Sequence, residues 1–214
     1  MENITAITVN WLTTRRTLGA VNSFRKYYPQ MPLLIIDDGS DPRDKDDFFR
    51  VYRGDAEVIY DPDNNKLKQY PDSEYIQVPT HRRHGESIDY ALPSIKTKWI
   101  FHFDSDVRFI KPGVIENMFT GVNDNVCGIG ISKTQKHGYE KIANMVAVFR
   151  ADLAKQYKDE GATFSPIYEL GLEAGTRYFK VLTDKDYRIK FCDVTGYYKH
   201  LRYNGGNDDW TRYF

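Results

Sequence analysis

Two aspartates on alternate residues follow an aromatic and aliphatic run near the middle of the chain. The run Trp99–Phe103 predicts a buried strand, and Asp104 and Asp106 come directly after it. Carboxylates spaced in this way at a strand end can share one divalent cation, or bind one cation and one ribose hydroxyl. In open α/β sheets, ligands bind beyond the carboxyl ends of the strands. Position and residue type therefore predict a cation or ligand site at Asp104 and Asp106.

The Asp-x-Asp pattern needs this context, because the chain is rich in aspartate. It has 21 Asp residues, and a random arrangement of that composition contains roughly two such patterns. The chain contains four, at Asp44/Asp46, Asp61/Asp63, Asp104/Asp106 and Asp184/Asp186. The other three fall in a predicted charged helix, a polar loop and a helix-to-strand turn. The alternative interpretation of the third pair is a capping or turn pair before Pro112.

The elements that must position these aspartates alternate between strands and helices. Apolar runs predict strands at 4–10, 33–36, 57–60, 99–103, 126–132, 144–149 and 188–193. Helical spacing predicts helices at 18–28, 43–52, 88–95 with a kink at Pro93, 112–119, from 151 onward, and 168–182. The polar stretch 61–80 is predicted as a long loop with at most a short strand at 75–78, and the last 15 residues as a mobile tail. The order predicts an α/β domain that opens like a nucleotide-binding fold.

Composition describes one ordinary folded domain. The chain has 214 residues with 41% hydrophobic and 28% charged residues, enough for a sizeable core without disulfides. Thirty Lys and Arg balance thirty Asp and Glu. A net charge of zero argues against a dedicated binder of nucleic acid or anionic membranes.

Cysteine use and the N-terminus predict a cytoplasmic protein. Cys127 and Cys192 are too few for a disulfide scaffold and are predicted to be buried thiols in a reducing compartment. The N-terminus lacks the basic and apolar regions of a signal peptide, and no run approaches the roughly 18 apolar residues of a membrane span. Peripheral membrane association stays open.

Four segments, in order, carry a resemblance to a known family. They are ITAITVN at the first strand, LLIIDDGS at the end of the second, HGESIDYA leading into WIFHFDSD, and NMVAVFRADL. With this order and spacing, the chain resembles the GT-A glycosyltransferases, especially family 2, which use nucleotide-diphosphate sugars. The resemblance spans about residues 4 to 200. It implies a GT-A fold, which is Rossmann-like with a mixed central sheet flanked by helices.

The resemblance implies a nucleotide pocket at the strand ends. Val9 and Asn10 would line it, Asp38 would contact the base or ribose, and His84 with Gly85 would lie near the base or diphosphate. For Asp38, the alternative is a turn residue, because Asp-Asp-Gly-Ser is also a good turn sequence.

The resemblance also implies a metal site. Asp104 and Ser105 would face the ribose, Asp106 would bind Mn²⁺ or Mg²⁺ with Asp104 beside it, and His200 would complete the metal shell. A divalent cation stabilises the charge that develops on a diphosphate leaving group, and hard oxygen ligands suit such a cation. A lone histidine is more often a packed or surface residue, which is the alternative for His200 and the prediction for His102.

For the acceptor, the resemblance implies an acid that removes the hydroxyl proton. Glu173 is the first candidate and Glu169 the second. The second acid of the family's usual pair is missing, since Ala174 stands in its place. The two glutamates are four residues apart, so an ordinary acidic helix face is the alternative. Whether the transfer inverts or retains the sugar's configuration is left open.

Together these features predict a single GT-A domain over 1–214, with a nucleotide-binding half at 1–107, an acceptor-binding half at 108–200 and a flexible tail at 201–214. The predicted activity is a metal-dependent hexosyltransferase (EC 2.4) that uses a UDP- or GDP-type donor and an unidentified glycan, lipid-linked or protein acceptor. One alternative is a Mg²⁺-dependent aspartyl phosphohydrolase with Asp104 as nucleophile. Another is an inert domain that binds sugar nucleotides or glycans.

Overall fold

The fold is described from a computed structural model of the chain. The structure describes residues 3–10, 14–37, 60–61, 66–67, 70–77, 84–131, 133–136, 139–142, 145–166 and 174–201. None of the helices within these ranges is both long enough and apolar enough to cross a bilayer.

A mixed β-sheet forms the centre of the described molecule. Its order is β12-β8-β11-β6-β1-β2-β5-β4-β3. The strands are β1 (Ile4–Asn10), β2 (Leu33–Asp37), β3 (Tyr60–Asp61), β4 (Lys66–Leu67), β5 (Tyr70–Gln77), β6 (Trp99–Phe103), β8 (Val126–Gly130), β11 (Val146–Arg150) and β12 (Arg188–Phe191). The neighbours β5, β2, β1 and β6 run parallel, whereas β11 runs antiparallel to both β6 and β8. Of these, β1, β2 and β6 are largely apolar on both faces, because helices cover both sides.

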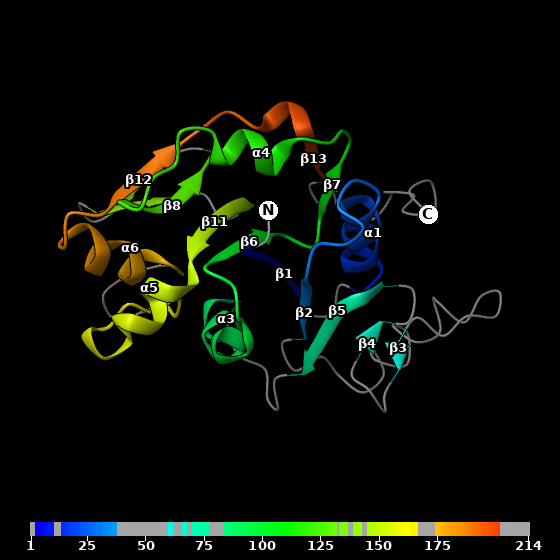
Figure 1. The fold of residues 1–214 in the computed structure, drawn as a ribbon, viewed down its shortest axis with the longest axis horizontal. Helices are drawn as coiled ribbons and strands as arrows, with labels where there is room; N and C mark the ends of the chain where they lie inside the picture. The colour runs from blue at the N-terminus through cyan, green and yellow to red at the C-terminus, as the bar shows by residue number, and fades with distance from the viewer. Residues whose placement is uncertain are drawn as a thin grey trace.

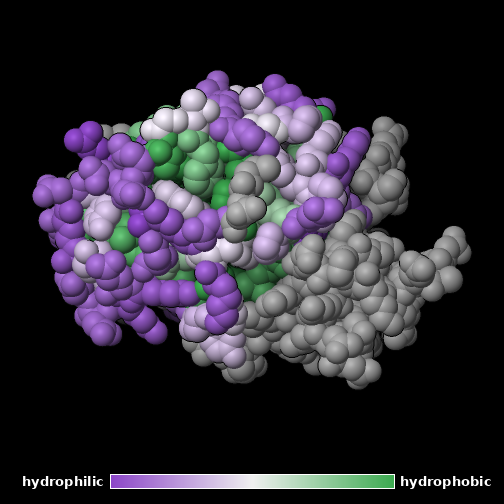
Figure 2. Space-filling view, viewed as in Figure 1, coloured by the Kyte–Doolittle hydropathy of each residue, from purple (hydrophilic) through white to green (hydrophobic). Residues whose placement is uncertain are grey.

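Helices cover the two faces of the sheet unequally (Figure 1). One face carries α1 (Thr14–Arg25) and α4 (Val114–Phe119). The other carries α3 (His84–Ala91) with the 3₁₀ turn Leu92–Ser94, then α5 (Ala151–Gln156) and α6 (Thr176–Thr183). Hydrophilic residues dominate the surface over β12, α5 and α6, on the left of Figure 2.

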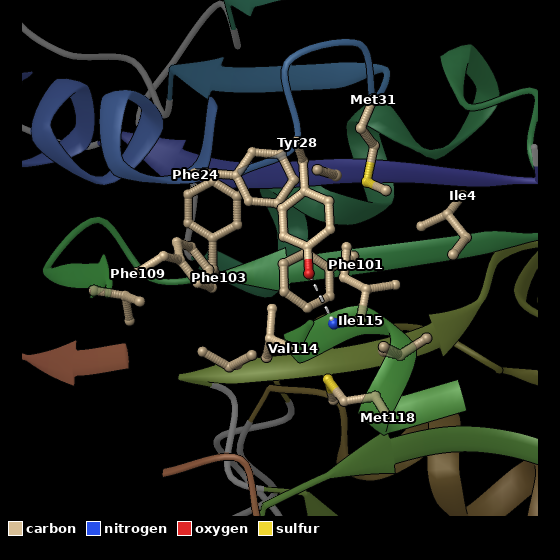
Figure 3. Packing of buried hydrophobic residues seen from close by; sticks show 14 of the residues in the cluster. Ile4, Phe24, Tyr28, Met31, Phe101, Phe103, Phe109, Val114, Ile115 and Met118 are labelled. Atoms are coloured by element: carbon tan, nitrogen blue, oxygen red, sulfur yellow. Dashed lines mark hydrogen bonds between the residues drawn. The ribbon is translucent and has the colours of Figure 1, made fainter. Parts of the chain in front are cut away.

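The core beneath α1 is aromatic, as Figure 3 shows. The Phe24 ring stacks on Phe101 and Phe103, with centroids 5.7 and 5.1 Å away, and meets Phe109 edge-on. At the margin of this cluster, the Tyr28 hydroxyl accepts hydrogen bonds from backbone N–H groups of α4, including that of Ile115 at 3.2 Å. Burial raises the pKa of Tyr28 to about 12. This packing fixes β6 and α4 against α1.

Two further two-stranded pairings extend the described fold. One joins β9 (Lys133–Lys136) to β10 (Tyr139–Ile142). The other joins β7 (Val107–Phe109) to β13 (Tyr198–His200), which follows the 3₁₀ turn Thr195–Tyr197. The second pairing brings the end of the described chain to the segment just after β6.

Most predicted elements are present, but the helix predicted at 168–182 begins at Thr176, after Gly175 with its positive φ of 79°. The strand at 4–10 is confirmed residue for residue, and the helix at 88–95 becomes α3 plus a 3₁₀ turn that contains Pro93. The predicted helix at 112–119 starts later, at Val114, because Gly113 has a positive φ of 94°. The predicted helix at 43–52, and the tail from residue 202 onward, lie outside the described residues.

The prediction of a loop over 61–80 was wrong, except that the short strand predicted at 75–78 falls at the end of an observed strand. An eight-residue strand, β5, spans Tyr70–Gln77 and pairs in parallel with β2 from Ser73 to Gln77. Pro71 misled the prediction, because proline is tolerated only at strand starts, edges and bulges. Here it lies near the start of β5, before the part that pairs with β2, where the β4–β5 register is irregular.

The predicted third strand at 57–60 falls mostly outside the described residues. Tyr60 belongs to the short strand β3, which pairs antiparallel with β4 at the sheet edge. The third parallel strand of the opening unit is therefore β5.

Candidate functional site

The carboxyl ends of three parallel strands meet at one edge of the sheet. In the sheet, β1 has β2 on one side and β6 on the other. The strand order therefore changes direction at β1. Asn10 at the end of β1 pairs with Asp37 at the end of β2, and Ile7 pairs with His102 near the end of β6. Such a change of direction opens a crevice where ligands bind in α/β sheets.

The Asp-x-Asp segment is a tight turn that leaves β6 at this edge. The N–H of Asp104 donates to the carbonyl of Met145 at 2.9 Å, and the N–H of Val107 donates back to the carbonyl of Asp104 at 3.2 Å. Backbone bonds therefore fix both ends of the turn. The predicted pair lies where a strand-end site requires it.

Arg108 holds this turn from the side of α1. Its buried guanidinium donates from Nη1 to the carbonyls of Ser105 at 3.3 Å and Val107 at 2.7 Å. Gly19 of α1 packs directly against the guanidinium, where a Cβ atom would overlap it. The close approach of α1 to β7 therefore depends on a glycine at position 19.

The pairing of β7 with β13 brings His200 to Asp106. Val107 lies opposite His200 in the ladder, and the N–H of Leu201 donates to the carbonyl of Asp106 at 2.9 Å. The His200 Nε2 atom lies 3.1 Å from the Asp106 Oδ2 atom. Both side chains remain about a quarter exposed, at 28% and 25%. The pair can therefore offer one nitrogen and one carboxylate to a ligand in the crevice.

The surroundings of Asp104 disfavour the charged form of its carboxyl group. About 30% of its side chain is exposed, yet the protein atoms around the carboxyl raise its pKa to about 7. Burial is the larger cause, and the negative charge of Asp106 is the second. A cation beside the two carboxylates would offset both effects.

His102 is fully buried, as predicted for a core histidine, but it belongs to the site. Its Nε2 atom lies 2.9 Å from Nε2 of His84 and 3.8 Å from Oδ1 of Asp104. Burial lowers the pKa of His84 to about 4. This grouping was not predicted from the sequence. A signal was present, because side chains two residues apart in extended chain, such as 102 and 104, point to the same face of the sheet.

The other predicted pocket residues on β1 and α3 are buried. Asn10 accepts a hydrogen bond at Oδ1 from the Thr17 hydroxyl at 2.9 Å, so its side chain is held toward α1. Val9 is in the apolar cluster on the α3 face. A Cβ atom on Gly85 would overlap the carbonyl oxygen of Phe164, so close packing already accounts for this glycine. Their contacts with a nucleotide stay predictions.

Three predicted site residues lie outside the described residues. They are Asp38, Glu169 and Glu173. The chain on either side of the last two is firmly anchored: Asp89 of α3 accepts from the backbone N–H groups of Phe164 and Ser165 at 2.9 and 2.8 Å. Beyond the gap, the N–H of Gly175 donates to the carbonyl of Phe164 at 2.9 Å.

Searches against family models and curated proteins found no match to this chain. Comparison with solved structures did find matches. The mannosyltransferase PcManGT from Pyrobaculum calidifontis, in complex with GDP-Man and Mn²⁺, matches with a TM-score of 0.66 and 12% identity over 90% of this chain and 55% of that one. Residues 1–349 of S. aureus TarS match with a TM-score of 0.58 and 16% identity over 92% of this chain and 59% of that one.

A second TarS structure, in complex with UDP-GlcNAc, also matches with a TM-score of 0.58 and 14% identity, over 95% of this chain and 60% of that one. The chain thus spans a little over half the length of these structures. The similarity confirms the predicted GT-A fold.

Proposed function

We propose that this chain, which has the GT-A fold, is a metal-dependent glycosyltransferase of the hexosyltransferase type. It moves a sugar from a UDP- or GDP-type donor to an acceptor hydroxyl. The observation that carries the proposal is the contact of Asp106 with His200, 3.1 Å apart, beside Asp104 at the carboxyl edge of the parallel strands. The donors present in the matching structures, GDP-Man and UDP-GlcNAc, support this donor class.

The residues at this edge fit a divalent cation. Asp106 and His200 are in contact there, and the negative charge of Asp106 contributes to the raised pKa of Asp104. Carboxylate oxygens suit Mn²⁺ or Mg²⁺, with Asp106 and His200 as the proposed ligands and Asp104 beside them. When bound, the ion supplies Lewis-acid stabilisation to the departing diphosphate.

The chain's own groups hold the nucleoside in this proposal. Asp38, Asp104 and Ser105 contact the base and ribose, while Val9 and Asn10 form the floor of the pocket. The Thr17 bond to Asn10 and the Arg108 bonds to the Asp-x-Asp turn keep those parts in place before the donor arrives. Preorganised contacts of this kind reduce the cost of binding.

His84 and Gly85 begin α3 and face the base or diphosphate in the proposal. Glu173 removes the acceptor proton as the sugar bond breaks, and Glu169 is the second candidate for that role. Each general base must come within hydrogen-bond distance of the acceptor hydroxyl to act.

The same proposal divides the chain into a nucleotide-binding half at 1–107 and an acceptor-binding half at 108–200. It also sets the protein in the cytoplasm, where sugar nucleotides and reduced thiols coexist. The burial of Cys127, which raises its pKa to about 12, agrees with an unreactive thiol.

A thermal-shift panel tests the proposal. UDP-sugars and GDP-sugars are added singly with Mn²⁺, Mg²⁺ or a chelator. A ligand at about 100 times its Kd stabilises the folded state by about 2.7 kcal/mol, or roughly 5 to 10 °C for a chain of this size. We expect such a shift for one donor class, and only when the metal is present.

Two variants make the panel specific. Asp106→Asn should abolish the metal-dependent shift. Asp184→Asn is the matched control, because it alters another Asp-x-Asp whose Asp184 is exposed and paired with Lys180. Equal shifts in both variants would contradict the proposed site. Donor binding without transfer to a broad acceptor panel would point to an inert binding domain, and release of phosphate from phosphomonoesters to a phosphohydrolase.

A further inference from the structure

Two imidazoles and one carboxylate converge on the α3 side of β6. His102 and Asp104 lie two residues apart and point to the same face, while His84 is the first residue of α3, which covers that face. The three ligating atoms all lie within 4.8 Å of one another. We call these three residues the histidine-pair site.

We propose that the histidine-pair site binds a divalent transition-metal ion such as Zn²⁺ or Co²⁺, separately from the cation at Asp106 and His200. This goes beyond the proposed glycosyltransferase function, which requires only the latter cation. The donor sets differ in kind: two nitrogens and one oxygen in the histidine-pair site suit zinc or cobalt, whereas magnesium prefers oxygen alone.

The distances agree with coordination of one ion. Ligand atoms at about 2.1 Å from a metal lie about 3.0 Å apart at a 90° angle and about 3.8 Å apart at 130°. The observed separations are 2.9 Å between the two Nε2 atoms and 3.8 Å between His102 Nε2 and Asp104 Oδ1. The third separation, bounded by 4.8 Å, closes to this range with a shift of less than about 1 Å.

A small cavity borders two of the three residues. It holds about 10 Å³ and is lined by His84 and His102, with walls from Gly85, Phe149 and Phe164 among others, whereas Asp104 is not part of its lining. That volume is close to the space of one water molecule. A water-sized position beside the two histidines is compatible with an open zinc site, in which three protein ligands leave a fourth position for water.

The Nε2 atoms of the two rings face each other, and a metal ion held by both is one arrangement that accounts for this contact. The alternative arrangement is a neutral histidine pair, in which an Nε2–H of one ring donates to Nε2 of the other. Metal coordination requires both Nε2 atoms to be unprotonated, whereas the hydrogen-bonded pair requires a proton on one of them.

A cobalt titration of the nucleotide-free, full-length protein tests the proposal. Co²⁺ in a four- or five-coordinate site with nitrogen ligands gives strong visible absorption. The titration is run in an Asp106→Asn background, which weakens the other cation site. We expect one equivalent of Co²⁺ to bind with this absorption, and Zn²⁺ to displace it.

His84→Gln in the same background should lower the Co²⁺ affinity at least tenfold. His102→Gln should do the same, and circular dichroism checks that each variant folds. His84 is only partly buried, so its variant keeps the test valid if His102→Gln fails to fold. The matched control is His200→Gln, which should leave the absorption unchanged.

No visible band in the Asp106→Asn protein, or equal affinity after His84→Gln, would overturn the histidine-pair site. Loss of the band in His200→Gln would also overturn it, because the ion would then lie at the other site. Since no nucleotide is present, these results do not depend on donor binding. Failure of the donor panel with an intact cobalt band would contradict the proposed function alone.

Discussion

The two faces of β6 carry opposite chemistry. On the α1 face, Trp99, Phe101 and Phe103 join the aromatic cluster around Phe24. On the α3 face, Ile100 is followed by His102, and then by Asp104 beyond the strand end. One five-residue strand therefore anchors the core with one face and supports titratable groups with the other.

The polar face holds two groups whose charged forms are disfavoured. The pKa values of Asp104 and His84 are both shifted toward the neutral forms, mainly by desolvation, although both side chains are only partly buried. Phe101 and Phe103 on the aromatic face contribute apolar burial and carry no polar group that needs a partner. We therefore predict that the aromatic face governs stability and the polar face governs ligand binding.

The largest expected effect comes from breaking the aromatic face. Phe101→Ala should lower the free energy of unfolding by about 3 to 5 kcal/mol, because the ring is fully buried and packs against Phe24 and Phe109. Urea denaturation measures the change. Phe101→Leu is the conservative comparison and should cost less. A loss below about 1 kcal/mol for the alanine variant would show that this cluster does not anchor β6.

Removing the hydrogen bonds from Arg108 to the Asp-x-Asp turn should have the second-largest effect on stability. Arg108→Met leaves the carbonyls of Ser105 and Val107 without their charged donor, at an expected cost of about 1.5 to 3 kcal/mol. Mn²⁺ affinity should also fall, because the turn loses its position. Lys199→Met is the matched control, since Lys199 lies opposite Arg108 in the ladder but is exposed. Equal changes in stability and Mn²⁺ affinity in the two variants would contradict the role of Arg108 in holding the turn.

Filling the close contact between α3 and Phe164 should cost about 1 to 3 kcal/mol. In Gly85→Ala the new Cβ overlaps a backbone carbonyl, which cannot move as freely as a side chain. Thermal unfolding measures the change. Gly196→Ala should be nearly neutral, because its Cβ would meet its nearest neighbour, Lys111 Nζ, at 3.5 Å. A neutral Gly85→Ala would mean that α3 is free to shift away from Phe164.

The smallest expected effects are on the pH dependence of stability, to which Asp104 and His84 on the polar face contribute with opposite signs. The pKa of Asp104 is raised to about 7, so in the metal-free protein its contribution to stability increases as pH falls from about 7 toward 4. The pKa of His84 is lowered to about 4, so its contribution decreases as pH falls from about 6.5 to 4.

Single variants should separate these contributions. Asp104→Asn should lose stability more steeply on acidification than the wild type, and His84→Gln less steeply. Denaturation series between pH 4 and 7, with chelator present, measure the slopes. Identical slopes in all three proteins would show that neither group is shifted as described.

The sequence predicted the elements with strong local signals. β1 is rich in β-branched residues and β6 in aromatic and aliphatic ones, and Pro93 lies just after the end of α3 as expected. β5 was missed because its alternation is weak and Pro71 suggests a loop. Its place beside β2 depends on pairing with a distant strand, which no local pattern encodes.

Part of the candidate site could also be predicted from the sequence. The Asp-x-Asp site was predicted from the apolar strand before it, and His200 was expected near the metal through the family resemblance. The contact of His84 with His102 was not predicted, because it requires α3 to lie across β6. His102 was correctly predicted as a core residue, but only the fold reveals that the ionisable His84 lies against it.

Calorimetric titration of UDP and GDP into the metal-free protein, with and without Mn²⁺, is the sharpest test of metal-dependent nucleotide binding at Asp106. We expect one of the two nucleotides to bind only when Mn²⁺ is present, and Asp106→Asn to remove this binding while Asp184→Asn retains it. If neither nucleotide binds the folded wild type, or if metal-dependent binding survives Asp106→Asn, the proposed glycosyltransferase site is wrong.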